Sequence, residues 1–214
     1  MKVAIITDQH FGSHKGSQVY LDYYSEFYEN IFFPWLKRNK ITTLLDLGDT
    51  FDNRKSIDFV TLNWARKYYD TLRAMDITVH TLVGNHTAYY KNTNELNTLA
   101  LLLQDYDNVY CYDDAIDLDI GGTSILFVPW ICAENYDKSL KTIRNSTSKV
   151  AMGHLELSGY LARPGFVYEH GMDAGIFSHF DLVLSGHFHH KSSKGNIKYL
   201  GNPYQIYWND YGIL

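Results

Sequence analysis

Cysteine is scarce in this chain of 214 residues, which contains only Cys111 and Cys132. The two are far apart in the sequence and form no C-x-x-C pair, so we expect reduced thiols and no disulfide framework. No apolar run approaches the roughly 20 residues that span a bilayer. We expect no signal peptide, because Met1 and Lys2 lead straight into an apolar run. These absences predict a soluble, cytoplasmic protein without a membrane partner.

Positive charge is also in short supply, because 19 Lys and Arg residues face 24 Asp and Glu residues and leave a net charge of −5. Proteins that grip nucleic acid over a broad surface usually present a basic face, so the balance argues against that mode of binding. It does not exclude nucleic acid as a substrate. Metal ions can supply positive charge at a scissile phosphate, and short basic clusters can contact the other phosphates.

Internal repeats, low-complexity tracts and Pro/Gly/Ser linkers are missing too, so we expect one domain over residues 1–214. Strand and helix patterns alternate, which predicts an α/β fold with helices covering a sheet. Buried strands are predicted over residues 3–7, 41–47, 77–83, 150–152 and 181–185. Helices are predicted over residues 18–39, with a kink or end at Pro34, and over 57–75, 94–104 and 135–145. Short strands in 109–129 predict a hairpin around Gly121-Gly122.

Each of the five predicted strands ends in residues that can bind a metal. The sets are Asp8-Gln9-His10, Gly48-Asp49, Gly84-Asn85-His86, Gly153-His154 and Gly186-His187-Phe188-His189. Ligands of open α/β sheets collect outside the carboxyl ends of the strands, so we expect these sets to converge. The seven candidate metal ligands are Asp8, His10, Asp49, Asn85, His154, His187 and His189. This number and order predict a two-metal hydrolytic site.

The donor types constrain the metals. Two ions about 3.5–4 Å apart can activate water and stabilise the displacement at a phosphorus atom. Such a pair needs a bridging anion, and Asp49 is the natural candidate because it is central in the order. Mixed nitrogen and oxygen ligation without thiolates suits Mn(II), Fe(II) or Zn(II), whereas Mg(II) favours oxygen ligands.

The motifs D-x-H, G-D-x-x-D, G-N-H, G-H and G-H-x-H, in this order over residues 3–189, resemble those of the calcineurin-like metallophosphoesterases. The resemblance implies a two-sheet α/β sandwich with flanking helices. It also implies one ion held by Asp8, His10, Asp49 and His189 and another held by Asp49, Asn85, His154 and His187. By the same resemblance, His86 is the catalytic histidine that stabilises the transition state or protonates the leaving oxygen.

Two positions beside these motifs modify the expectation. Asp52 matches the acid that orients the catalytic histidine in phosphatase branches of the family. We therefore expect a pair in which the Asp52 carboxylate fixes the tautomer of His86 and favours its imidazolium. Alternatively, Asp52 caps the helix that follows. Thr87 stands where the family usually has Asp or Glu, which affects the support of the loop but not a metal ligand.

Within the family, the pattern G-D-x-F-D-x-R at residues 48–54 is most similar to the SbcD-type double-strand-break-repair nucleases, which include recombination subunits of tailed phages. Further similarity lies in residues 82–86, 128–130, 153–157, 185–189 and 199–203. The resemblance implies a Mn-dependent DNA nuclease of recombination and repair, acting as a 3′–5′ exonuclease and single-strand endonuclease. It implies a homodimer and an SbcC-type coiled-coil ATPase as partner, in the host cytoplasm if the protein is phage-encoded. Branch members continue into a DNA-capping domain, so a chain ending at Leu214 is expected to be a shortened or a minimal enzyme.

Other residues have two interpretations each. The candidates for DNA phosphate contacts, in loops just after ligand sets, are His14, Lys15, Arg54, Lys55 and Lys91. The alternative for all five is an ordinary solvated side chain. The apolar faces of helices 57–75 and 94–104 suit a dimer interface, although packing on their own sheet explains most of the same pattern.

Two other functions fit the same motifs less well. The first is a phosphatase or small-molecule phosphodiesterase on the same core, which preference for a phosphate monoester over a diester would reveal. The second is a non-catalytic subunit that docks DNA or an ATPase. The complete set of seven ligand candidates and His86 argues against the loss of catalysis.

Overall fold

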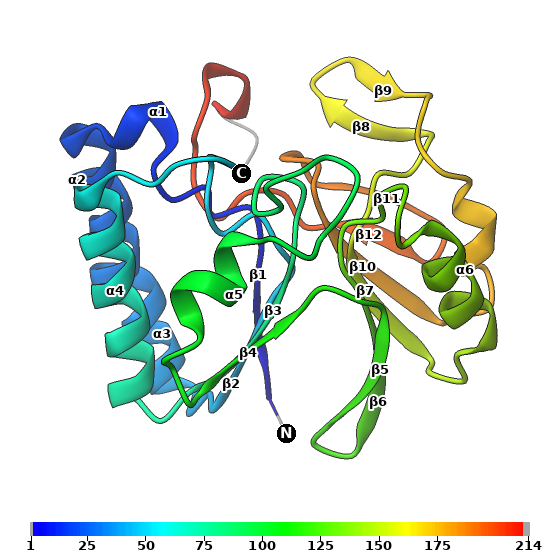
Figure 1. The fold of residues 1–214 in the computed structure, drawn as a ribbon, viewed down its shortest axis with the longest axis horizontal. Helices are drawn as coiled ribbons and strands as arrows, with labels where there is room; N and C mark the ends of the chain where they lie inside the picture. The colour runs from blue at the N-terminus through cyan, green and yellow to red at the C-terminus, as the bar shows by residue number, and fades with distance from the viewer. Residues whose placement is uncertain (1, 212–214) are drawn as a thin grey trace.

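Two β-sheets pack face to face in this protein, and helices cover their outer faces (Figure 1). The computed structural model describes residues 2–211; Met1 and residues 212–214, at the ends of the expected domain, lie outside the described part. Within residues 2–211 the four-stranded sheet has the order β1-β2-β3-β4, and the six-stranded sheet has the order β11-β12-β10-β7-β6-β5. The predicted two-sheet α/β sandwich with flanking helices is confirmed.

The four-stranded sheet is parallel throughout. Its strands are β1 (Ala4–Ile6), β2 (Thr43–Asp46), β3 (Thr78–Leu82) and β4 (Val109–Tyr112). The first three lie inside predicted strands, and β4 comes from the 109–129 segment. Because all four strands run in the same direction, their carboxyl ends meet at one edge of the sheet.

The six-stranded sheet is mixed. Its strands are β5 (Ile116–Ile120), β6 (Thr123–Val128), β7 (Val150–His154), β10 (Leu182–Gly186), β11 (Ser192–Lys194) and β12 (Ile197–Tyr199). The neighbours β6, β7, β10 and β12 are parallel, and the edge strands β5 and β11 are antiparallel. The turn between β5 and β6 is Gly121-Gly122, with φ of 60° and 86°, as left-handed hairpin turns require. This confirms the predicted hairpin.

Neighbouring side chains in the strands serve different cores. Leu45 of β2 and Leu184 of β10 pack between the two sheets, whereas Leu44 and Val183 face the helices on either side. Side chains alternate across a strand, and a strand covered on both faces needs an apolar residue at nearly every position. The apolar runs at 3–6 and 150–152 follow from this burial.

The first predicted helix is continuous but changes its winding. It consists of α2 (Gln18–Phe27), a π-helical turn η1 (Tyr28–Phe32) and α3 (Phe33–Arg38). Pro34 lies in the first turn of α3, in the interior of this continuous helix, so it cannot donate a helical hydrogen bond to the preceding turn. The π-turn directly before Pro34 absorbs the irregularity, so the expected end of the helix at Pro34 is wrong.

The remaining predicted helices are present and shorter than expected: α4 (Phe59–Ala74), α5 (Thr98–Leu103) and α6 (Tyr136–Asn145). The cap of α4 is Asp58, whose carboxylate accepts a hydrogen bond from the Thr61 N–H at 2.9 Å. The alternative interpretation of Asp52 as the cap of this helix is therefore wrong. In the part of the chain that the structure describes, no helix is long and apolar enough to cross a membrane.

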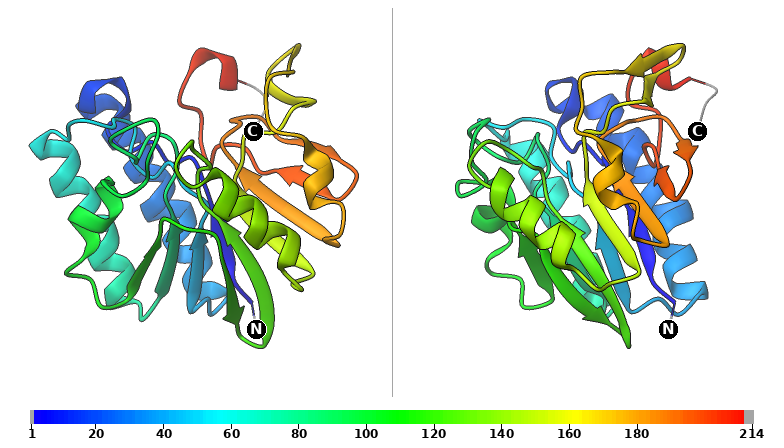
Figure 2. Two further views of the ribbon diagram at one scale, coloured as in Figure 1. Left: turned by 45° about the vertical axis from the view of Figure 1, so that its right-hand side comes forward. Right: turned by 90° about the vertical axis from the view of Figure 1, so that its right-hand side faces the viewer.

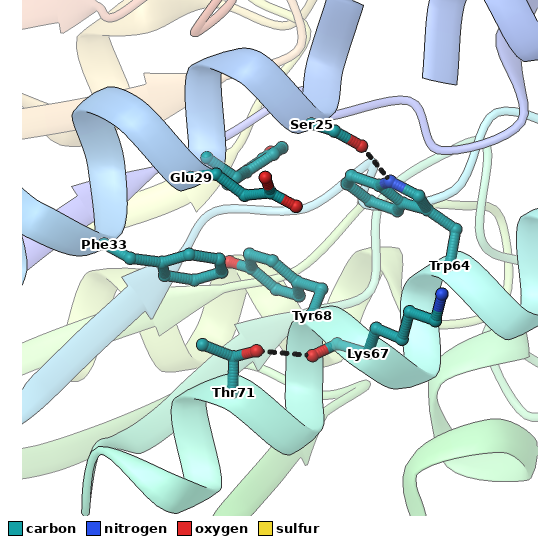
Figure 3. Close-up of a pocket in the computed structure, with 8 residues that line it drawn as sticks. Ser25, Glu29, Phe33, Trp64, Lys67, Tyr68 and Thr71 are labelled. Atoms are coloured by element: carbon teal, nitrogen blue, oxygen red, sulfur yellow. Dashed lines mark hydrogen bonds between the residues drawn. The ribbon is translucent and has the colours of Figure 1, made fainter. Parts of the chain in front are cut away.

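Tyrosine rings fill much of the core between the four-stranded sheet and its helices; they are Tyr24, Tyr28, Tyr68, Tyr69, Tyr106 and Tyr204. A cavity of about 330 Å³ opens beside them between α4 and the π-turn (Figure 3). In its wall, Trp64 Nε1 donates to Ser25 Oγ at 2.6 Å and Thr71 Oγ1 donates to the Lys67 carbonyl oxygen at 2.7 Å. These polar groups pair within the wall, and the cavity lies on the helical side of the sheet.

Two projections stand above the edge where the carboxyl ends of the strands meet (Figures 1 and 2). One is the antiparallel hairpin of β8 (Tyr160–Arg163) and β9 (Phe166–Tyr168). The other is the C-terminal segment, which ends in the short helix η3 (Trp208–Asp210). The loop that follows β1, with the single turn α1 (Ser13–Gly16), lies beside the C-terminal segment.

Candidate metal centre

The structure brings the seven ligand candidates together at the edge shared by the two sheets. Asp8 and His10 follow β1, Asp49 follows β2, Asn85 follows β3, His154 ends β7, and His187 and His189 follow β10. Each sheet therefore contributes part of the site. The packing of one sheet on the other decides whether the donors face one another.

Four of the seven candidates have a left-handed backbone, which is rare for residues with a side chain. Their φ angles are 52° for Asp8, 49° for His10, 52° for Asp49 and 86° for His187. Such conformations cost on the order of 1–3 kcal/mol each and persist where the surrounding structure imposes them. The strain is concentrated in the turns that aim these side chains at one another.

Two glycines allow the ligand loops to approach closely. A Cβ atom on Gly84 would lie 2.2 Å from Oδ1 of Asp49, and a Cβ atom on Gly186 would lie 2.8 Å from Oδ2 of Asp8. Neither glycine has a positive φ. Because these glycines have no side chain, a carboxylate from another loop can lie against their backbone.

Asp8, His10 and His189 form the first donor group, with one ligand atom of each within 4.8 Å of the others. Nε2 of His10 lies 3.1 Å from Nε2 of His189 and 4.0 Å from Oδ1 of Asp8. Because His10 Nδ1 donates to the Asp52 carboxylate at 3.0 Å, Nε2 carries the lone pair of the neutral ring. Burial lowers the pKa of His189 to about 3, so this ring is neutral. Two imidazole nitrogens and a carboxylate around one point fit a divalent cation.

Asp49, His154 and His187 form the second group, and Asn85 joins it. Oδ1 of Asn85 lies 2.9 Å from His154 Nε2 and 2.8 Å from His187 Nδ1, and Asp49 Oδ2 lies 3.2 Å from His154 Nε2. Burial alone would lower the pKa of His154, but the Asp49 carboxylate raises this pKa to about 9. Burial and the charge of His154 lower the pKa of His187 to about 3. The mixed nitrogen and oxygen donors fit a second divalent cation.

His86 lies beside both groups, but its partner differs from the expected one. Its main-chain N–H donates to Asp49 Oδ1 at 2.7 Å, and its Nδ1 donates to the main-chain oxygen of Asp52 at 2.6 Å. The Asp52 carboxylate instead accepts from His10 Nδ1. The two loops run side by side, with Asp52 N donating to the Phe11 carbonyl oxygen at 3.0 Å, which turns the carboxylate toward His10. The expected carboxylate–His86 hydrogen bond is therefore replaced by a main-chain one.

A sequence model of the calcineurin-like phosphoesterases matches residues 1–191 of this chain. The chain belongs to the calcineurin-like phosphoesterase family. The match includes all seven ligand candidates and His86. Together with the two donor groups, it identifies a phosphoesterase core whose residues suit a binuclear metal site.

Two viral proteins are similar in sequence. Exonuclease subunit 1 of Enterobacteria phage T4 is 39% identical over 170 residues, which are 79% of this chain and 50% of that protein. The putative phosphoesterase 078R of Invertebrate iridescent virus 3 is 29% identical over 178 residues, again 79% of this chain and 50% of that protein. The chain thus spans about half the length of the curated relatives that it matches.

A dimetal phosphatase from Danio rerio has a similar structure. The TM-score is 0.55 at 11% sequence identity, and the superposition covers 94% of this chain and 87% of that one. At this identity the likeness concerns the fold alone. It supports the description of this phosphoesterase as a two-sheet sandwich of the family type.

His14, an expected DNA contact, has a different partner in this phosphoesterase. Its Nε2 donates to the Ile206 carbonyl oxygen at 2.7 Å, and its ring stacks on Tyr20 with centroids 3.8 Å apart. A half-buried ring held in this way is not an ordinary solvated side chain, and its role as a DNA contact stays a prediction. His14 connects the loop after β1 to the C-terminal segment, which lies 192 positions away in the sequence.

The other expected DNA contacts lie in loops at the same edge. Lys15, Lys55 and Lys91 are exposed, and Lys15 borders a cavity of about 260 Å³ next to the His10 loop. Arg54 is half-buried, and its Nη1 donates weakly to the Ala88 carbonyl oxygen at 3.4 Å. No bound phosphate tests these four residues, so their role stays a prediction.

The Thr87 side chain stabilises the loop that carries His86. Its buried hydroxyl accepts from the Gly84 N–H at 2.9 Å and donates to the Gly84 carbonyl oxygen at 3.1 Å. The side chain thus closes the turn that carries Asn85 and His86. A threonine at the usual position of an acid is therefore compatible with an ordered loop.

A buried polar network below the metal centre has only a weak signal in the sequence, a glutamine between two ligand candidates. Gln9 Nε2 donates to Asp46 Oδ2 at 2.9 Å, and Thr50 Oγ1 donates to the same atom at 2.6 Å. The hydroxyls of Tyr28 and Tyr204 donate to the side-chain and main-chain oxygens of Gln9 at 2.6 and 2.5 Å. Burial raises the pKa of Asp46 to about 7. The network fixes the loop on which Asp8 and His10 lie.

Proposed function

We propose that this chain is a Mn-dependent DNA nuclease of recombination and repair that acts as a 3′–5′ exonuclease and as a single-strand endonuclease. The convergence of seven ligand candidates from two sheets carries the proposal, because it supplies the donors for two ions. The similarity to a phage exonuclease subunit supports DNA as the substrate class. Residues 1–214 are taken as a single catalytic domain, acting in the cytoplasm, which is the host's if the protein is phage-encoded.

In this proposal, Asp8, His10, Asp49 and His189 hold one ion, and Asp49, Asn85, His154 and His187 hold the other. Asp49 would be the bridging ligand; its Oδ2 lies 3.2 Å from His154 Nε2 in the second group, and its Oδ1 accepts from the main-chain N–H of His86. Two divalent ions bound there would supply a nucleophile from water near neutral pH and positive charge beside the phosphoryl oxygens. Mn(II) is the first choice, with Fe(II) and Zn(II) as alternatives for the same donors.

His86 is the proposed acid–base residue. Because its Nδ1 donates to the Asp52 carbonyl oxygen, Nε2 is the nitrogen left to exchange a proton with the leaving oxygen. Proton transfer of this kind contributes typically ~10²–10⁴-fold to a rate. Asp52 contributes twice: its main chain orients His86, and its carboxylate orients His10.

Lys15, Arg54, Lys55 and Lys91 remain the proposed contacts to DNA phosphates, and their spread over three loops suits a strand that passes across the metal centre. The phage T4 relative is named as one subunit of an exonuclease, which supports a protein partner for this chain. By resemblance, that partner is a coiled-coil ATPase of SbcC type.

The proposed homodimer uses the exposed face of α4 and α5. Leu101 is 58% exposed and Leu96 is 38% exposed, and they border a groove of about 400 Å³, one end of which is lined by Arg54 and Lys55. Contiguous exposed apolar surface of this kind marks an interaction site. Sedimentation of the wild type and of Leu101→Glu would test the dimer: the variant should sediment as a monomer, and an unchanged sedimentation coefficient would exclude this face.

The test of the activity is digestion of 5′- and 3′-labelled linear DNA with Mn(II), Mg(II) or EDTA. Mn-dependent shortening from the 3′ end is expected. It should disappear in Asp49→Asn and persist in Asp70→Asn, a matched change of an exposed carboxylate on α4. His86→Ala should abolish hydrolysis and leave metal binding nearly intact, while His179→Ala, which changes an exposed histidine, should do neither.

The same preparations separate the proposal from its rivals. Faster turnover of bis(p-nitrophenyl) phosphate than of the monoester favours a diesterase, whereas the opposite preference favours a phosphatase. Diester turnover without DNA cleavage would mean that the site is competent and that the chain needs further contacts to hold DNA. No turnover of any ester with metal bound would favour the docking subunit and contradict the proposal.

A further inference from the structure

The C-terminal segment returns to the metal centre after the last ligand candidate. Tyr204 stacks on Tyr24 with ring centroids 4.3 Å apart, and its hydroxyl donates to the Gln9 carbonyl oxygen at 2.5 Å. The chain then continues through Ile206 to Tyr207, which is 42% exposed. Tyr207 thus lies above the loop that carries Asp8 and His10.

Tyr207 contacts both histidines of the first donor group, one directly and one through a carboxylate. Its ring lies parallel to the His189 imidazole, at 9° and with centroids 5.9 Å apart. Its hydroxyl lies 3.4 Å from Asp52 Oδ1, the same oxygen that accepts from His10 Nδ1 at 3.0 Å. Tyr207 therefore lies against the His189 ring and reaches His10 through the Asp52 carboxylate.

The turn that carries Tyr207 is held rigidly. Oδ2 of the buried Asp210 accepts hydrogen bonds from the N–H groups of Tyr207 and Ile206, at 2.8 and 3.0 Å, and from Asn202 Nδ2 at 3.2 Å. On the other side, His14 Nε2 donates to the Ile206 carbonyl oxygen. Four hydrogen bonds thus hold the turn that carries Tyr207, as expected for a segment with a positional role.

We propose that Tyr207 is a positioning residue for the ion held by Asp8, His10 and His189, because it limits the rotation of both imidazoles. The inference rests on the metal centre of the proposed function. An imidazole turns about a broad, soft torsion at χ2, so a ligand ring needs contacts on its outer side to aim its nitrogen. Partners of metal ligands that fix ring orientation are typically worth about 10–100-fold in metal affinity or activity.

The chemistry of the phenol suits this role. A phenol is protonated near neutral pH and can donate one hydrogen bond. The hydroxyl therefore keeps its proton and remains a donor to Asp52. This weak donor lies beside the Asp52 oxygen that accepts from His10, while the ring face lies parallel to His189.

The test is a calorimetric titration of the metal-free full chain with Mn(II), which should resolve two binding steps in the wild type. Tyr207→Ala should weaken one step by about 10–100-fold and leave the other unchanged. Tyr207→Phe keeps the stacking ring and removes the donor, so its effect on the same step should be smaller. Trp208→Ala and Tyr211→Ala change exposed side chains of the same turn and should leave both steps unchanged.

Asp210→Asn provides a second approach that keeps the tyrosine. It weakens the acceptor for the Tyr207 N–H and should weaken the same binding step as Tyr207→Ala. Thermal unfolding in EDTA controls for folding. If Tyr207→Ala weakened both binding steps equally, Tyr207 would have a general structural role and the inference would be overturned. Unchanged metal binding with a raised KM would make Tyr207 a substrate contact and would also overturn the inference.

The two proposals fail in different ways. A wild type that binds no Mn(II) would refute the metal centre and, with it, the proposed function. A wild type with two binding steps, both insensitive to Tyr207→Ala, would refute the role of Tyr207 alone.

Discussion

Replacing Gly84 by alanine should disable the metal centre through a single methyl group. The added Cβ would lie 2.2 Å from Asp49 Oδ1 and 2.5 Å from the Asp49 main-chain nitrogen. An ordinary contact begins at 3.4 Å, so the carboxylate and the glycine must move apart by 3.4 minus 2.2, or about 1.2 Å. Gly84 has no positive φ, which removes backbone strain as a competing explanation.

The displacement is large on the scale of metal ligation. Metal–ligand distances tolerate about 0.2 Å, and a misplacement of about 1 Å can reduce a rate ~10²-fold. We therefore expect Gly84→Ala to lose at least about 100-fold in kcat/KM for bis(p-nitrophenyl) phosphate. Overpacking of a filled site typically costs about 1–3 kcal/mol of stability, which a folded variant can tolerate.

The assay combines three measurements on the same preparation: diester turnover, calorimetric titration with Mn(II), and thermal unfolding in EDTA. Gly175→Ala is the matched control, since its Cβ would meet only the end of the Asp173 side chain, at 3.2 Å. It should behave like the wild type in all three. If Gly84→Ala bound two equivalents of Mn(II) with wild-type affinity, the close approach of Gly84 and Asp49 would not be a constraint on the site, and the reasoning would be refuted.

Three further predictions concern single groups. Thr87→Val leaves a buried main-chain N–H without its acceptor, so chemical denaturation should show a loss of about 1–3 kcal/mol, whereas Thr142→Val on the surface of α6 should change little. Since Asp49 raises the pKa of His154 to about 9, Mn(II) binding at pH 7 should release a proton, and the affinity for Mn(II) should increase as the pH rises toward 9. A binding heat that is the same in buffers of different ionisation enthalpy would contradict this release. Burial raises the pKa of Asp46 to about 7 from a usual value near 4, so its contribution to stability is present below pH 4 and is lost as the pH rises through 7. The metal-free Asp46→Asn variant should therefore gain stability relative to the wild type as the pH rises from about 4 to about 7, by at most about 4 kcal/mol, and parallel stability curves would refute the shift.

The strands that position the metal centre could be predicted because burial on both faces leaves a direct mark on the sequence. Runs such as 3–7 and 150–152 are apolar at almost every position, and the polar residues that follow them mark the carboxyl ends. Parallel pairing then brings those ends together without any knowledge of side-chain packing. Helix limits were less accurate: α5 begins only after Asn97, whose side chain caps the helix.

The partners of the site residues could not be predicted in the same way. Both Asp52 and His86 belong to motifs, but which oxygen of Asp52 meets His86 depends on the pairing of two loops. His14 and Tyr207 acquire their contacts only because the chain returns to β1 after His189, an event that no local pattern records. Sequence spacing thus specifies donors at strand ends, whereas tertiary packing specifies what orients them.

Because the metal centre lies between two sheets, a bound ion would link parts of the chain that are far apart in the sequence. His10 and His189 are 179 positions apart in the chain, and their Nε2 atoms face each other at 3.1 Å. An ion shared by them would be a removable cross-link across nearly the whole chain, and closing so long a loop restricts the unfolded ensemble strongly. A chelator would then act on this protein as a reductant acts on a disulfide-linked one. The lifetime of the folded chain, and not its activity alone, would follow the concentration of free metal.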